Sequence, residues 1–281
     1  MHIYKHSKIL ALCATVVWLM FIFSAFKGFH FWYAGFVFFF WFSLATLNYR
    51  HETTLWIVKN RFKKFARFYL VLIVVGFVAD FVIGQQIAHL WSYPFYDSFD
   101  DWLRLYAIIY PFGGLTILEL SFLLGNLFHE RFIFLPKVHN TLVRSIDLFD
   151  HIVDTFLAVV LIGGPIMYFS GAHIPLAQVV VYAFLLWAVL TTIELACHLR
   201  HGSHWVAIFV VALFMSVLLH EVPNTVAFEW KYGYAPILNA SIVGIPLWVV
   251  VGWYLMTLVM LRLWLRLMLD AKNGRSRAPI H

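Results

Sequence analysis

Two carboxylic acids lie inside long apolar runs, and each is followed by a tryptophan and a tyrosine two residues apart. Asp80 precedes Trp91-Ser92-Tyr93, and Glu221 precedes Trp230-Lys231-Tyr232. A third acid, Glu119, lies in the middle of another apolar run. A charge at membrane depth costs about 2.5–3.5 kcal/mol even on the more lenient scale, so such residues face a bundle interior and are functional hypotheses by default.

The chemistry available to such acids is proton transfer in an apolar cavity. A neutral carboxylic acid can protonate a C=C bond, and aromatic faces can stabilise the carbocation that forms. We therefore predict that Asp80, Glu119 and Glu221 are catalytic and converge on one interior cavity. The alternative is structural, each acid bonding a neighbouring helix. The residues predicted to line the cavity mouth and bind the substrate are Trp91, Tyr93, Trp230 and Tyr232.

A second group of ionisable residues has helical spacing and is expected near the cytoplasmic surface of the membrane. Asp147, Asp150, His151 and Asp154 are spaced i, i+3, i+4, i+7, which places them on one helix face. Carboxylates and imidazoles on facing helices are how metal sites in bundles are built, although capping and salt bridging explain the same pattern. The candidate metal ligands are Asp150, His151, Asp154, Glu194, His198 and His201.

Composition places the chain in a membrane. Of its 281 residues, 63% are apolar and 12% are charged; soluble proteins have roughly 45–50% apolar and about 25% charged residues. We predict an all-α integral membrane protein, because runs of about 20 apolar residues match the hydrocarbon core. The eight predicted transmembrane helices are 9–27, 30–47, 68–90, 105–128, 148–170, 176–197, 205–225 and 238–266.

The basic residues predict the orientation of these helices. Lys and Arg gather before the first span, in the loops after the second, fourth and sixth spans, and after the eighth. The opposite loops hold Asp97, Asp100, Asp101 and Glu229 with few basic residues. By the positive-inside rule both termini are cytoplasmic. The net charge of +6 is then an orientation signal, and it gives no reason to expect a nucleic-acid partner.

The two halves of the chain read as copies of one unit. Leu44-Ala45, Arg50-His51 and Trp56 recur as Leu195-Ala196, Arg200-His201 and Trp205, upstream of the two acid-containing runs. Because each half holds an even number of spans, the copies run in the same direction. We predict two parallel four-helix repeats, which are residues 1–140 and 141–281.

Short segments of the two halves share a pattern of acid, Trp-x-Tyr and Gly-containing run. These segments are Ala79-Asp80, Leu90–Tyr93 and Leu115–Phe122 in the first half, and Trp230–Tyr232 and Gly244–Leu247 in the second. They resemble the membrane lycopene cyclase domain of carotenoid biosynthesis, a family that shows an Asp on a helix, a Trp-x-Tyr/Phe and then a Gly and a Pro-Leu-Glu-Glu run.

The match departs from the family at several positions. Thr116 and Leu118 stand where the family has Pro and the first Glu, and only Glu119 matches, as the second Glu. In the second half Trp248 and Val249 replace both acids. The resemblance implies protonation and deprotonation of a long polyene without a metal or an organic redox centre.

The leading hypothesis is a membrane enzyme that takes a lipophilic, isoprenoid-like or carotenoid-like substrate from the bilayer and acts by acid–base, cyclisation-type chemistry without a cofactor. A bacterial inner membrane is the expected location. One alternative is a lipid-modifying enzyme that uses a divalent metal at the cytoplasmic face. Another is a non-enzymatic transporter or an accessory subunit of a membrane complex. The sequence names no protein partner.

Overall fold

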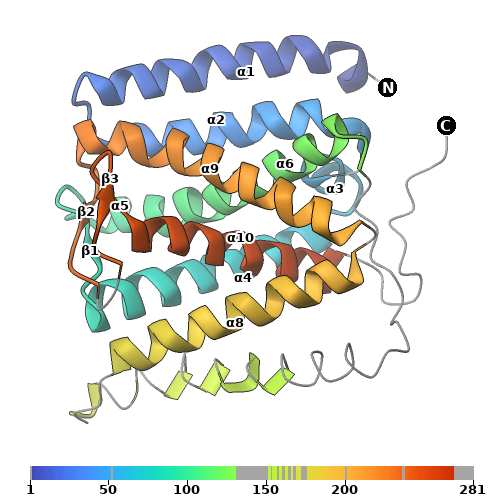
Figure 1. Ribbon diagram of the computed structural model, residues 1–281. Coiled ribbons are helices and arrows are strands. Elements are labelled where there is room, and N and C mark those ends of the chain that lie inside the picture. The colour runs from blue at the N-terminus through green and yellow to red at the C-terminus, as the bar shows by residue number, and fades with distance from the viewer. Residues whose placement is uncertain are drawn as a thin grey trace.

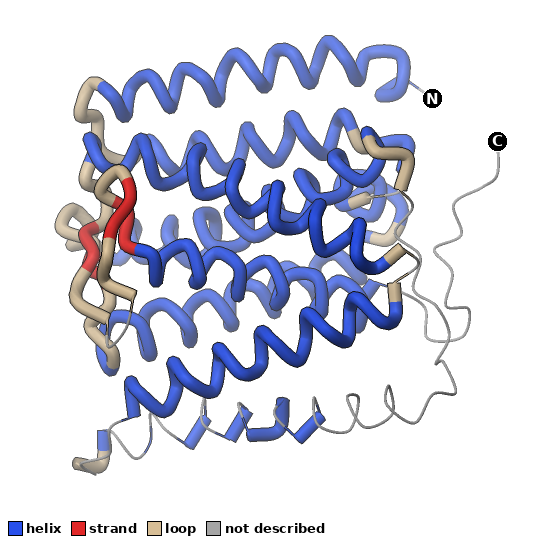
Figure 2. The backbone as a smooth tube through the Cα atoms, in the orientation of Figure 1, coloured by secondary structure: helices blue, strands red, loops and turns tan. Residues whose placement is uncertain are grey.

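The protein is a bundle of long helices that lie side by side, with a small patch of strands at one end (Figures 1 and 2). The computed structural model describes residues 2–51, 53–130, 176–199, 201–235 and 238–268, with scattered positions between 151 and 171. The first turn of α1 and the last turn of α10 lie at the end opposite the strands. This is the relation expected when both termini lie on one side of a membrane.

Seven of the eight predicted spans fall on described helices, and the fifth, 148–170, lies largely outside the described residues. Among the described residues, five apolar helical stretches are long enough to cross a membrane, and two more are shorter. The long helices are α1 (His2–Phe26), α2 (Trp32–Leu47), α4 (Phe62–Gly76), α6 (Tyr110–Leu127), α8 (Leu176–His198), α9 (Gly202–Ala227) and α10 (Leu247–Met268).

Two of these helices are extended by π-helical segments. The segment η2 (Phe77–Ile87) continues α4, and η3 (Leu105–Ile109) joins the short helix α5 (Phe99–Arg104) to α6. A 3₁₀ turn, η1 (Tyr49–His51), and the helix α3 (Thr54–Asn60) lie between α2 and α4. π-Helical turns are uncommon and occur frequently at functional sites.

Helix α6 is the centre of the bundle. In the most apolar 18-residue segment of α5–η3–α6, 67% of the residues are buried inside the protein. The corresponding share for α1 is 17%. Glycines allow the close packing: a methyl group on Gly114 would lie 2.6 Å from Met260 Sδ of α10, and one on Gly125 would lie 2.5 Å from the Trp205 ring of α9. Small residues at helix contacts are typical of membrane bundles, where backbones approach closely.

The strands in the described part of the chain form two short antiparallel pairs. Strand β1 (Trp91–Ser92) pairs with β2 (Lys231–Tyr232), and β3 (Ser241–Ile242) pairs with β4 (Ile245–Pro246). The prediction that the last span begins at 238 is therefore wrong by nine residues. Val243 and Gly244 have φ angles of 53° and 77°, and a two-residue turn with two positive φ values closes a hairpin before α10 begins.

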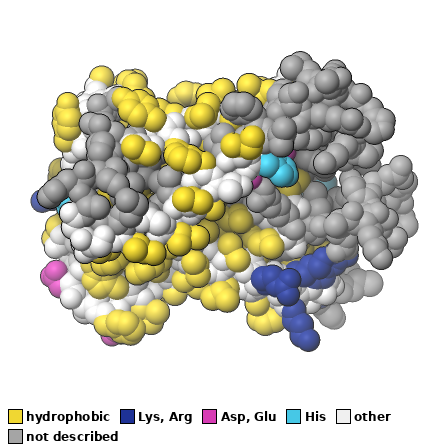
Figure 3. All heavy atoms as spheres, turned by 90° about the horizontal axis from the view of Figure 1, so that it is seen from below, with side chains coloured by type: hydrophobic (Ala, Val, Ile, Leu, Met, Phe, Trp, Pro, Cys, Tyr) yellow, Lys and Arg dark blue, Asp and Glu magenta, His cyan; other side chains and the backbone are white. Residues whose placement is uncertain are grey.

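The surface agrees with a bilayer environment. Apolar side chains cover the middle of the face seen in Figure 3, and most of the visible Lys and Arg side chains lie toward the end opposite the strands. Helix α1 exposes Ile9, Leu12, Met20 and Phe23, each by 60% or more. An exposed apolar surface of this extent is expected to contact lipid acyl chains.

Candidate functional site

Asp80 is buried and surrounded by hydrogen-bond donors. Tyr93 donates to Asp80 Oδ1 over 3.0 Å, and the Trp91 indole N–H and the Tyr110 hydroxyl donate to the same oxygen. Tyr106 and Gln85 each donate to Oδ2 over 2.7 Å. These five donors are one more than the roughly four lone-pair sites of a carboxylate. We call Asp80 with Trp91 and Tyr93 the Asp80 unit.

The two π-helical segments carry much of this arrangement. Asp80 and Gln85 lie on η2, and Tyr106 lies on η3. Gly84, also on η2, leaves room for the Trp91 ring, since a methyl group there would lie 2.2 Å from Trp91 Cζ2. The indole of Trp91 therefore reaches Asp80 only because residue 84 has no side chain.

Glu221 has the corresponding partners in the second half of the chain. The Trp230 indole donates to Glu221 Oε2 over 3.3 Å, and the Tyr232 hydroxyl donates to the same oxygen. Trp253 of α10 donates to Oε1 over 2.6 Å. Glu221 thus accepts three hydrogen bonds where Asp80 accepts five. We call Glu221 with Trp230 and Tyr232 the Glu221 unit.

The strand pair β1–β2 joins the two units. Trp91 is opposite Tyr232, and Ser92 is opposite Lys231. The Gly233 N–H donates to the Leu90 carbonyl over 2.6 Å and extends the pairing. The side chains of each Trp-x-Tyr segment therefore donate hydrogen bonds to the acid of the same unit. The backbones of the two segments pair with each other.

Trp248 lies between the two units. Its ring stacks on Trp91 with the centroids 5.9 Å apart, and Tyr232 meets it edge-on at 5.6 Å. Its indole N–H is buried and has no hydrogen-bond partner in the part of the chain that the structure describes. A buried indole N–H ordinarily finds a partner, and the Trp32 indole N–H is another buried donor without one among the described residues.

Glu119 is in a different environment. Its Oε1 accepts from the Thr54 backbone N–H over 2.8 Å and from the Thr54 hydroxyl, while the Asn48 amide donates to Oε2 over 2.7 Å. Thr54 is the first residue of α3, so the carboxylate caps that helix. The structure does not bring Glu119 together with Asp80 and Glu221, which were expected to share one cavity with it.

The candidate metal ligands are divided among several contacts. Arg262 forms ion pairs with Asp154, over 2.7 Å, and with Glu194, and the Trp187 indole also donates to Asp154. His151 is exposed, and His201 contacts Glu130. Asp150 and the His198 side chain lie outside the described residues, as does Asp147. The guanidinium thus pairs with two of the three carboxylates that the sequence offered to a metal.

Several side chains that surround the two units were not predicted from the sequence. Tyr106 and Tyr110 are four residues apart, so their shared helix face was a usable signal. Trp253 follows Glu221 by 32 residues, and nothing in the sequence relates them. Tyr33 of α2 bonds the buried His220 next to Glu221, which likewise only the packing of α2 against α9 reveals.

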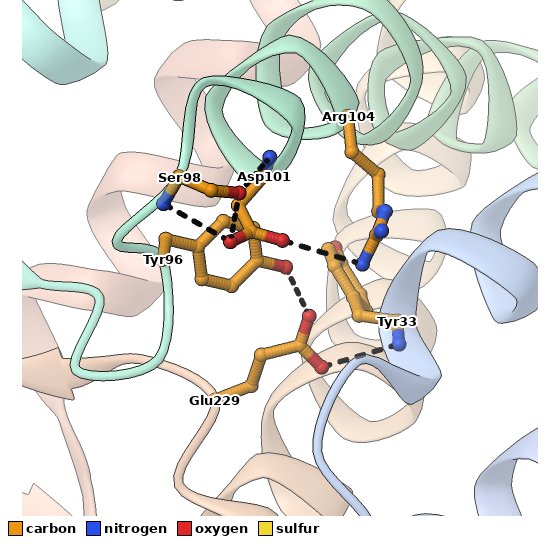
Figure 4. A network of polar contacts seen from close by, with 6 residues as sticks. All are labelled: Tyr33, Tyr96, Ser98, Asp101, Arg104 and Glu229. Carbon is orange, nitrogen blue, oxygen red and sulfur yellow. Dashed lines mark hydrogen bonds and ion pairs between the residues drawn. The ribbon is translucent and has the colours of Figure 1, made fainter.

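A fourth buried acid, Glu229, follows α9 and links its own loop to the loop that holds Tyr96 and to the start of α2. The Tyr96 hydroxyl donates to its Oε1, and the Tyr33 backbone N–H at the start of α2 donates to Oε2 over 3.2 Å (Figure 4). Asp101 lies nearby with Ser98 and Arg104 around it. Burial raises the pKa of Glu229 from 4.5 to about 7.

Comparison of the chain with protein-family models, with curated proteins and with solved structures found no match.

Proposed function

We propose that this chain is an integral membrane enzyme that performs acid–base chemistry on a lipophilic, isoprenoid-like substrate between the Asp80 and Glu221 units. One observation carries the proposal. Two buried acids from different halves of the chain each accept hydrogen bonds from a Trp and a Tyr, and these two Trp-x-Tyr segments pair with each other. A pair of acids so arranged offers one proton donor and one proton acceptor.

The roles of the two acids follow from their partners. Glu221, with three donors around it, is the proposed proton donor, and Asp80, with five, is the proposed base. The Glu221 proton adds to a terminal C=C bond and leaves a carbocation, which a neighbouring C=C bond attacks to close a ring. The Asp80 carboxylate then removes a proton and restores a C=C bond. The product is an isomer of the substrate, so no oxidant or reductant is required.

The surroundings of the units suit an extended polyene. Trp91, Trp248 and Tyr232 form a continuous aromatic contact between the two acids. Aromatic faces stabilise cations and offer flat apolar surface. Because the helices of the bundle expose apolar residues on their outer faces, a substrate dissolved in the bilayer reaches the protein without crossing water.

The proposal includes the architecture predicted from the sequence. We propose eight spans in two parallel four-helix repeats, with both termini on the cytoplasmic side of a bacterial inner membrane and the strands on the other side. The coincidence of seven predicted spans with described helices supports it, as does the matching position of the two acid units. The transporter and accessory-subunit alternatives use the same architecture.

The test is turnover by the purified protein in liposomes loaded with an acyclic C40 polyene, in heavy water. Wild-type protein is expected to yield a cyclised isomer that carries deuterium, detected by liquid chromatography and mass spectrometry. Asp80→Asn and Glu221→Gln should each lower the rate by about 100- to 10,000-fold, which is the usual effect of losing a general acid or base. Asp100→Asn changes an exposed acid in α5 and should leave the rate unchanged.

Two results would count against the proposal. If both the Asp80 and Glu221 variants kept wild-type turnover, the units would not carry the chemistry. If the wild-type protein converted no acyclic isoprenoid but moved protons across the same liposomes, the transporter alternative would replace it. Elution as a single species in size-exclusion chromatography is required of every variant, so that loss of folding is not counted as loss of chemistry.

A further inference from the structure

A glutamate and two histidines meet at the end of the bundle away from the strands. His201 Nδ1 lies 2.8 Å from Glu130 Oε2, and His204 Nδ1 lies 2.7 Å from Glu130 Oε1. One ligand atom from each of the three residues lies within 4.8 Å of the other two. The Glu130 side chain is 15% exposed, whereas the two imidazoles are 52% and 67% exposed. The cluster therefore opens to solvent on the imidazole side.

Helix-end hydrogen bonds hold the backbone of all three residues. In the turn that follows helix α6, His129 has a φ of 56°, and the Glu130 N–H donates to the Gly125 carbonyl over 2.8 Å. This is the Schellman pattern of a helix C-terminus. At the other helix, His201 precedes the first turn of α9 with a φ of 58°, and the His204 N–H donates to the His201 carbonyl over 2.9 Å.

The spacing of the two helix ends is set by a close contact beside the cluster. Trp205 is buried, and a methyl group on Gly125 would lie 2.5 Å from its ring. Gly125 is also the residue whose carbonyl accepts the Glu130 N–H. The contact between α6 and α9 therefore presents the carboxylate and the imidazoles to each other at a defined separation.

We propose that Glu130, His201 and His204 form a binding site for a divalent transition-metal ion of the Zn²⁺ type. Two imidazole nitrogens and one carboxylate oxygen are a common protein ligand set for zinc, and the fourth tetrahedral position then takes water or another small ligand. In such a site neighbouring ligand atoms are about 3.3 Å apart, as follows from Zn–N distances of about 2.0–2.1 Å. The ligand atoms, which now lie within 4.8 Å of one another, have to approach by about 1.5 Å at most, and each imidazole nitrogen has to move about 0.5 Å away from the carboxylate oxygen that it now contacts.

The charge and hydrogen bonding of the cluster fit this ion. Glu130 supplies a carboxylate whose two oxygens each lie within hydrogen-bond distance of an imidazole nitrogen. A neutral imidazole binds metal through Nδ1 when its proton is on Nε2, which the exposed rings can donate to water. Mg²⁺ and Ca²⁺ prefer oxygen ligands and are poorly matched by two imidazoles.

This site differs from the ligand set that the sequence indicated. It keeps His201 from that set and replaces the other members with Glu130 and His204. Because Arg262 holds Asp154 and Glu194, no metal is needed to satisfy those acids. The new site is independent of the proposed chemistry at the Asp80 and Glu221 units, which lie at the end of the bundle that carries the strands.

The experiment measures zinc binding by the full chain in detergent, purified with an affinity tag that contains no histidine. After treatment with a chelator and one equivalent of ZnCl₂, the wild-type protein is expected to retain one zinc per chain, measured by elemental analysis after gel filtration. His201→Ala and His204→Ala should each weaken binding by at least about 100-fold, because loss of a direct ligand exceeds the 10- to 100-fold cost of losing an outer-shell partner. Co²⁺ in place of zinc should give the visible absorption of a tetrahedral site.

The matched control is His151→Ala, an exposed histidine in the sequence-predicted set but outside this cluster. It should leave zinc retention unchanged. Glu130→Gln keeps the size of the side chain and removes its charge, so it should weaken binding while the thermal unfolding midpoint stays close to that of the wild type without metal. The proposal is overturned if the His201/His204 double variant retains as much zinc as the wild type, or if His151→Ala lowers retention equally.

Discussion

Glu119, Asp80 and Glu221 are all buried carboxyl groups of the same bundle. The hydrogen-bond partners of Glu119 nevertheless differ in kind from those of the other two acids. Glu119 accepts from the backbone and hydroxyl of Thr54 and from the Asn48 amide, which are small groups on a loop and a helix start. Asp80 and Glu221 accept mainly from phenols and indoles. The first arrangement caps a helix, and the second lies in an aromatic surface that a ligand can share.

Burial within an apolar run does not by itself separate a structural acid from a candidate functional one. All three acids are in apolar runs, and all three are buried. What separates them is whether the hydrogen bonds satisfy backbone groups that would otherwise be unpaired. Glu119 supplies an acceptor to the first N–H of α3, where helices leave donors without partners. We therefore assign Glu119 a structural role, which is to stabilise the start of α3.

The largest effect is expected from Glu119→Leu. This change leaves the Thr54 N–H and the Asn48 amide buried without their acceptor, at a cost of about 1–3 kcal/mol for each group. We expect a loss of about 3–5 kcal/mol in the free energy of unfolding, measured by thermal or denaturant unfolding in detergent. Asp80→Asn keeps an acceptor oxygen and should cost less than half as much. Equal costs for the two variants would remove the distinction between them.

Glu229 is an intermediate case, because it bonds both a phenol and a helix-start N–H. Its pKa in the folded protein is about 7, against 4.5 as the ordinary value. The folded chain therefore holds this proton over a pH range in which the unfolded chain has lost it. The contribution of Glu229 to the free energy of unfolding is therefore fully present below about pH 4.5, falls as the pH rises to about 7, and changes little above that.

The size of that change is on the order of 3 kcal/mol, at 1.36 kcal/mol for each unit of pKa difference. The measurement is the unfolding midpoint as a function of pH in the wild type and in Glu229→Gln. The variant has no titrating proton, so its profile between pH 4.5 and 7 should be flatter than that of the wild type. Profiles of equal slope would show that Glu229 does not carry this pH dependence.

The smallest effect is expected from removing single hydroxyls in the two units. Tyr232→Phe takes one of three donors from Glu221, whereas Tyr93→Phe takes one of five from Asp80. A hydrogen bond contributes about 1 kcal/mol, so we expect roughly a fivefold change in turnover for Tyr232→Phe and a smaller one for Tyr93→Phe. The liposome assay measures both. If Tyr93→Phe lowered turnover more than Tyr232→Phe, the number of donors around each acid would not determine the size of the effect.

Much of this arrangement could be predicted because hydropathy and spacing are local properties. Apolar runs gave the positions of seven helices that the structure describes, to within a few residues at most ends. The acid followed by Trp-x-Tyr in each half predicted a paired site, and the structure adds that these aromatic residues are hydrogen-bond partners of Asp80 and Glu221. Those partners are close in the sequence, so a short chain segment was enough to indicate them.

The sequence by itself determined that the chain is apolar and helical, and that two acids recur with the same aromatic neighbours. Only the tertiary structure decided that Glu119 bonds Thr54, that Arg262 holds Asp154 and Glu194, and that Glu130 meets His201 and His204. These contacts join residues 65 to 108 positions apart. Which side chains meet over such separations depends on how whole helices pack, and here the glycines of α6 allow that packing.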